Sequence, residues 1–193
     1  MAAASGDMSF LPHRGGYRNL KVYRITEVIY DVTFAFTSRF LCRGDRTVDQ
    51  MIQAARSGKQ NIAEGSKASS TSTETEIKLT NVAKASLEEL LVDFEDYLRV
   101  RGLQQWGVDH QRYQKLRAFC RDERLLTDYQ PLLQKLNDEE MGNLAITLIN
   151  QATYMLRRLI EKQQEMFLQH GGIREQMMHA RLAYRGKNNQ GPK

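Results

Sequence analysis

The chain has 193 residues, of which 41% are hydrophobic and 26% are charged, and Lys and Arg exceed Asp and Glu by five. This length and composition are typical of one globular domain with an appendage, and no run of about 18 apolar residues indicates a membrane span. The first residues lack the basic stretch and apolar core of a secretory signal, so we expect a cytoplasmic protein without a membrane partner.

Apolar spacing predicts helices along the chain, which has only three prolines. The first helix is expected over 18–41, because apolar residues recur every three or four positions for some six turns, longer than a usual strand. In the turn "RGDRT", Asp45 or Thr47 is expected to cap a second helix. Gly65, followed by the polar stretch "SKASSTST", predicts the C-terminal end of that helix.

Two capping boxes predict the starts of two further long helices. Thr73 with Glu76 begins the third helix, and Asn137 with Glu140 begins the fourth. Glycines are expected to end both, at Gly102 for the third helix and at 171–172 for the fourth. Between them lies a less regular section, with one helix expected over 110–122 and a loop around Pro131.

These elements predict an all-α fold, an antiparallel up-and-down four-helix bundle with an extra helix inserted between helices three and four and a short C-terminal helix. The expected organisation is a flexible N-terminus (1–16), the bundle (17–170), a helical insertion within it (103–136), a basic suffix (171–186) and a disordered tail (187–193).

Catalytic chemistry has little support in the sequence. None of the four histidines stands three residues after a Glu, so the Glu-x-x-His pairs of di-iron bundles are absent, and the cysteines Cys42 and Cys120 have no His at ligand spacing. Three carboxylates, Glu89, Asp93 and Asp96, share one helical face, which indicates a solvated face or an interface rather than a catalytic pair. The glycines of "GKQNIAEGSK" (58–67) do not have the spacing of a phosphate loop. We therefore expect no enzyme activity, no metal and no cofactor.

Positive charge is concentrated in two regions. Between Arg14 and Lys67 there are ten Lys or Arg against five Asp or Glu, and from residue 171 onward there are five against one; residues 69–101 have four against seven. This separation of basic and acidic regions favours a polyanion partner or self-assembly. Stripes of cations can follow the phosphate backbone of RNA or DNA without reading bases. The candidate contacts are Arg14, Arg18, Lys21, Arg56, Lys59 and Lys67. That these cations only solubilise the surface remains the alternative.

Three segments, "YRNLKVY", "QMIQAARSGKQNIAEGSK" and "STETEIKLTNVAKASLEELLVDFEDYL", follow one another in the order of the predicted helices. Over 17–102 the chain resembles the four helix bundle protein family, also called the 23S rRNA intervening sequence protein family. The resemblance implies an antiparallel bundle that forms a homo-oligomer, with pentameric rings known in the family. One branch, the accessory variability protein of diversity-generating retroelements, binds a reverse transcriptase and nucleic acid through basic ring surfaces.

The resemblance places Asn61, Glu64 and Gly65 in the most family-specific stretch, "NIAEG". Asn61 and Glu64 are three residues apart, so we expect them to face a neighbouring helix as a structural polar cluster with Arg24, Arg56 or Lys59 as partners. The alternatives are a ligand site, or a hydrogen bond from Asn61 to the backbone of an adjacent subunit. The insertion at 103–136 and the C-terminal suffix depart from the short family pattern. The expected function is a non-enzymatic homo-oligomer that binds nucleic acid through a basic surface, as an accessory to an RNA or reverse-transcriptase system. The alternative is a structural or protein-interaction module with no direct nucleic-acid contact.

Overall fold

The computed structural model describes residues 16–188, and every regular element within them is helical, so this part of the chain is all-α. None of these helices is long and apolar enough to span a membrane. The long helices are α1 (Lys21–Phe40), α2 (Arg46–Ala68), α3 (Thr73–Val100) and α7 (Asp138–His170). The shorter ones are the 3₁₀ helix η1 (Tyr17–Asn19), α4 (Tyr113–Arg121), α5 (Leu125–Asp128), α6 (Gln130–Leu133) and α8 (Ile173–Asn188).

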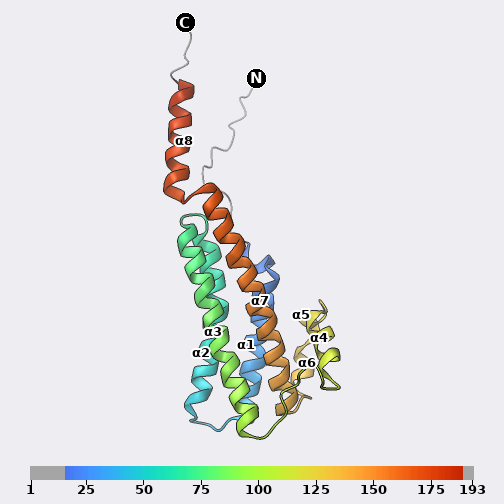
Figure 1. Cartoon of the computed structure of the whole chain (residues 1–193). Coiled ribbons are helices and arrows are strands. Elements are labelled where there is room, and N and C mark those ends of the chain that lie inside the picture. The colour runs from blue at the N-terminus through green and yellow to red at the C-terminus, as the bar shows by residue number, and fades with distance from the viewer. Residues whose placement is uncertain (1–15, 189–193) are drawn as a thin grey trace, which may run out of the picture.

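The four long helices lie alongside one another around one apolar core (Figure 1). Both α1 and α3 pack against α2 and α7. The ring of Phe36 is fully buried in this core, 4.9 Å from the ring of Phe94 and 4.6 Å from that of Tyr97, centroid to centroid. Burying an apolar side chain of this size stabilises the fold by about 1.5–3 kcal/mol, so the core accounts for the association of the long helices.

Helix ends follow local capping chemistry, with some shifts from prediction. Asp45 accepts a hydrogen bond from the backbone N–H of Thr47 and begins α2. The predicted capping box of Asn137 and Glu140 is present at the start of α7. At α3 the cap is Ser72 rather than Thr73, because Ser72 has the extended backbone and accepts from the N–H of Thr75. The first helix begins at residue 21 instead of 18, since η1 precedes it and extended Leu20 separates the two.

The prediction that Gly65 ends the second helix is wrong, because α2 continues to Ala68. Gly65 faces α3, where an added Cβ would lie 3.3 Å from both the Glu76 carbonyl oxygen and Leu79 Cβ. The glycine therefore allows close approach of two helices rather than a helix end. Gly171 does end α7, as predicted, with a positive φ of 70°.

The insertion folds back on the long helices instead of extending into solvent. It contains α4, which contacts α7, and α5, which contacts α1. Four of its side chains are buried with the main core: Cys120, Leu125, Tyr129 and Leu133. The predicted loop around Pro131 is a short helix, α6, because proline is tolerated in a first helical turn, where the missing N–H is not needed.

Polar side chains attach the insertion to the long helices. Asn143 of α7, 2% exposed, donates to the carbonyl oxygens of Gln104 and Glu139 at 2.9 and 2.8 Å and accepts from the N–H of Trp106 at 2.7 Å. On the α1 side, the Tyr129 hydroxyl donates to the Asp31 carboxylate. Buried polar groups are costly unless paired, so these contacts define one position for the insertion.

Helix α8 extends beyond the end of the long helices (Figure 1). Four large apolar side chains on it are exposed: Met177, Met178, Leu182 and Tyr184. The helix continues through residue 188, past the predicted boundary of the suffix at 186. The predicted flexible N-terminus and disordered tail fall largely on residues 1–15 and 189–193, outside the described residues.

Candidate nucleic-acid interface and ligand groove

Two of the predicted cations, from different elements, gather around one tyrosine ring. Arg18 of η1 has its Cζ 5.2 Å from the centroid of the Tyr17 ring, and Lys67 at the end of α2 has its Nζ 5.8 Å from the same centroid. The Tyr17 ring in turn packs edge-on against Tyr23, with centroids 4.8 Å apart. Packing of η1 on α1 and α2 thus brings together two cations that are far apart in the sequence. Arg14 lies outside the described residues.

A second cation–aromatic contact lies on the α1–α2 surface. The Nζ of half-buried Lys59 is 4.4 Å from the centroid of the Tyr30 ring. Arg56 is exposed on α2 and forms no ion pair with any residue from 16 to 188. We call Tyr17, Arg18, Tyr30, Lys59 and Lys67 the cation–tyrosine surface.

Among the predicted cations that the structure describes, only Lys21 forms an ion pair within the chain. Its Nζ forms an ion pair with Glu123 of the insertion at 2.5 Å, and Arg24 approaches the same carboxylate at 3.9 Å. The hydrogen bond from Lys21 and its charge lower the pKa of Glu123. Because the insertion folds onto the start of α1, Lys21 faces a carboxylate of its own chain, a contact that helical spacing could not reveal.

The polar residues of "NIAEG" do not form one cluster. Asn61 donates to the backbone carbonyl and the hydroxyl of Ser57 at 2.9 and 3.1 Å, and the Ser57 hydroxyl lies 2.9 Å from the Ser86 hydroxyl of α3. Glu64 is exposed, whereas Gly65 is buried against α3. The polar link between α2 and α3 therefore consists of Asn61, Ser57 and Ser86, without the predicted partners Arg24, Arg56 and Lys59.

Helix α3 carries an acidic outer face. Burial, together with the neighbouring carboxylates of Glu89 and Asp96, raises the pKa of Asp93. Val82 and Val100 lie on the same side of the helix by their spacing and are 45% and 74% exposed. The face predicted from the carboxylate spacing is thus present, and it also exposes apolar groups.

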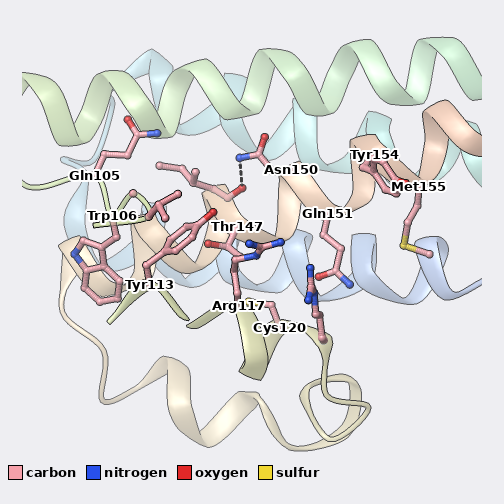
Figure 2. Close-up of a pocket in the computed structure, with 14 residues that line it drawn as sticks. Gln105, Trp106, Tyr113, Arg117, Cys120, Thr147, Asn150, Gln151, Tyr154 and Met155 are labelled. Carbon is pink, nitrogen blue, oxygen red and sulfur yellow. Dashed lines mark hydrogen bonds between the residues drawn. The ribbon is translucent and has the colours of Figure 1, made fainter. Parts of the chain in front are cut away.

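A groove that the sequence did not predict lies between α4 and α7, with a volume of about 670 Å³ (Figure 2). Residues 105–108 line it together with these two helices. Tyr113, Arg117 and Arg121 follow i, i+4, i+8 spacing on α4, and all three line the groove. That spacing is a detectable signal, but which helix it faces depends on the fold of the insertion.

The lining of the groove includes one thiol and, among the described residues, no carboxylate. Its thiol, Cys120, is buried, and burial raises the pKa of that thiol to about 12, so the nucleophilic thiolate is scarce at neutral pH. Across residues 16–188, no three His, Cys, Asp or Glu side chains are grouped to hold a metal ion.

A scan of protein-family models finds no match to this chain, and searches of the curated proteins and of the solved structures likewise find none.

Proposed function

We propose that the four long helices form an antiparallel up-and-down bundle that self-associates and binds nucleic acid without catalysing a reaction. The packing of α1 and α3 against both α2 and α7 supports the bundle. The resemblance of residues 17–102 to the four helix bundle protein family supports the role of an accessory to an RNA or reverse-transcriptase system, and a pentamer as the form of the oligomer.

The observation that carries this proposal is the cation–tyrosine surface. Arg18, Lys59 and Lys67 each lie against a tyrosine ring, and none forms an ion pair with another described residue. Cations without carboxylate partners attract phosphates, and neighbouring aromatic rings can stack with unpaired bases. Together they favour a single-stranded segment of RNA or DNA over a duplex.

The test is fluorescence anisotropy of a labelled, mixed-sequence single-stranded RNA over a salt series. If three phosphates are neutralised, the logarithm of the binding constant should fall with the logarithm of salt concentration with a slope of about −2. The triple variant R18E/K59E/K67E should lose binding at low salt.

A matched control reverses three cations at the opposite end of α1, R43E/R46E/K135E, which changes the net charge by the same amount. It should retain most of the affinity. Equal loss of binding in both triple variants would mean that only net charge matters, and no binding by the wild type at low salt would contradict the proposal outright.

A protein-interaction module without direct nucleic-acid contact is the second candidate. It is favoured by the uncovered apolar side chains of α8 and by the acidic, valine-bearing face of α3. Both features are typical of surfaces that other protein surfaces cover.

A further inference from the structure

The groove between α4 and α7 has the size of a small-molecule site. Its volume of about 670 Å³ lies within the range of roughly 300–1,000 Å³ that is typical of ligand pockets. Figure 2 shows Tyr113, Arg117 and Thr147 gathered in its central part. A simple inorganic anion would fill only a small part of this volume.

One wall of the groove is cationic. Arg117 and Arg121, one helical turn apart on α4, both line it, and neither forms an ion pair with any described residue. The guanidinium Cζ of Arg117 lies 5.7 Å from the centroid of the Tyr113 ring. Among the described residues, no Asp or Glu lines the groove. Two guanidinium groups without carboxylate partners favour an anionic ligand group, and phosphate matches their planar, forked geometry.

The other wall presents polar groups that suit a heterocycle. Asn150 donates its amide N–H to the Ile146 carbonyl at 3.0 Å, which leaves its Oδ1 available as an acceptor. Gln151 and the hydroxyl of Tyr154, a residue 57% exposed, make no hydrogen bond to another described residue. An acyl chain placed here would leave these groups unpaired, which is costly when water is displaced. Ile146 and Met155 add apolar surface for a flat ring.

We propose that this groove binds a nucleoside 5′-phosphate, with the phosphate on Arg117 and Arg121 and the base against the amide and tyrosine groups of α7. The site is separate from the cation–tyrosine surface, because its residues come from the insertion and from α7. The groove binds either a free nucleotide or one nucleotide of a single strand, because both present a phosphate and a base.

Trp106, the only tryptophan of the chain, lines the groove, so its fluorescence reports on occupancy. The full-length protein is titrated with 5′-AMP and 5′-UMP, and calorimetry detects binding that leaves the fluorescence unchanged. Saturable binding of either nucleotide, with adenosine and inorganic phosphate each at least tenfold weaker, is the expected result. No binding of either nucleotide at millimolar concentration would overturn the proposal.

The decisive variant is R117Q/R121Q, for which the Kd for nucleotide should rise at least tenfold. Its matched control is R43Q/R46Q, which removes two exposed arginines at the junction of α1 and α2 and should bind as the wild type does. Circular dichroism checks folding; if the double variant loses helicity, R121Q alone replaces it, because Arg121 is exposed. An unchanged Kd in the folded groove variant would refute the assignment.

Two comparisons separate this site from the proposed nucleic-acid surface. The R18E/K59E/K67E variant should still bind 5′-AMP, so failure of one proposal does not entail failure of the other. Loss of oligonucleotide binding in R117Q/R121Q would assign the groove to a nucleotide within a strand, whereas retention of oligonucleotide binding with loss of 5′-AMP binding would assign it to a free nucleotide.

Discussion

Lys21, Asn143 and Cys120 show how the insertion determines the roles of individual side chains. Lys21 pairs with Glu123, and Asn143 makes two hydrogen bonds that attach residues 104–106 to α7. Cys120, buried between α4 and the core, is a packing residue with a thiol held in its neutral form. Each role depends on the position of residues 103–136 against the long helices.

Cys120 should make the stability of the protein depend on pH in the alkaline range. Burial raises the pKa of its thiol from 9.0 to about 12. In the unfolded chain the thiol loses its proton near pH 9, while the folded state keeps it, so its contribution to stability is complete below pH 9 and declines up to about pH 12. The decline should approach about 1.4 kcal/mol per pH unit in this window.

The measurement is urea unfolding of the wild type and of C120A between pH 8 and 11. Tyr97 and Tyr129, whose pKa values burial also raises, are present in both proteins, so the difference in slope isolates the thiol. C120A should be less stable at pH 8 because a buried side chain is smaller, but should lose less stability as the pH rises. Parallel pH profiles would contradict this account.

At the scale of elements, the close approach of α2 to α3 depends on small residues in α2. An added Cβ at Gly58 would lie 2.6 Å from a methyl carbon of Leu87, and one at Gly65 would lie 3.3 Å from the backbone of α3. A side chain at Gly58 would displace a flexible leucine side chain, whereas a side chain at Gly65 would press on the backbone of α3. Substitution at Gly65 therefore tests the spacing between the two helices directly.

Gly65→Leu should reduce the free energy of unfolding by about 1–3 kcal/mol, because the larger side chain forces α2 away from α3. Urea unfolding monitored by circular dichroism measures the change. Gln53→Leu, which places the same side chain on the exposed side of α2, should change stability by no more than about 0.5 kcal/mol. Similar effects of the two substitutions would show that Gly65 is not a contact point between helices.

At the scale of the whole molecule, α8 is an amphipathic helix whose large apolar side chains are left exposed by the described residues. Ile173, Met177, Ala180 and Tyr184 follow one helical stripe, and Arg174, Arg181 and Arg185 follow the next. A helix of 16 residues is marginal in water without a packing partner. The acidic face of α3, with its exposed valines, is complementary in both charge and hydrophobicity.

We expect α8 to contribute to self-association by packing on the acidic α3 face of another copy. Multi-angle light scattering gives the number of subunits as the particle mass divided by the mass of one chain. This number should be smaller for a chain ending at residue 172 than for the full-length protein, whereas deletion of 189–193 alone should leave it unchanged. R174E/R181E/R185E should likewise reduce the number of subunits. Mixing R174E/R181E/R185E with E89K/D93K/D96K should restore association, because the acidic α8 of the first protein is complementary to the basic α3 face of the second. An equal number of subunits in all these proteins would contradict a role for α8.

Periodicity and capping residues sufficed to predict an all-helical chain and most helix boundaries, because both are interactions within a few residues of the chain. The capping box of Asn137 and Glu140 and the end of α7 at Gly171 are confirmed for this reason. The end assigned at Gly65 is wrong, since a glycine serves both helix termination and close helix packing, and only the presence of α3 beside it distinguishes the two.

The sequence by itself determined where the long helices form and which of their faces are apolar or charged, since these properties depend on side chains one or two turns apart. Only the tertiary structure decided that Lys21 meets Glu123, that Arg18 and Lys67 share the ring of Tyr17, and that α4 and α7 enclose a groove. Those contacts depend on how the irregular segment 103–136 packs against α1 and α7. Its buried side chains and polar anchors define that arrangement through long-range contacts, which leave no periodic pattern in the sequence.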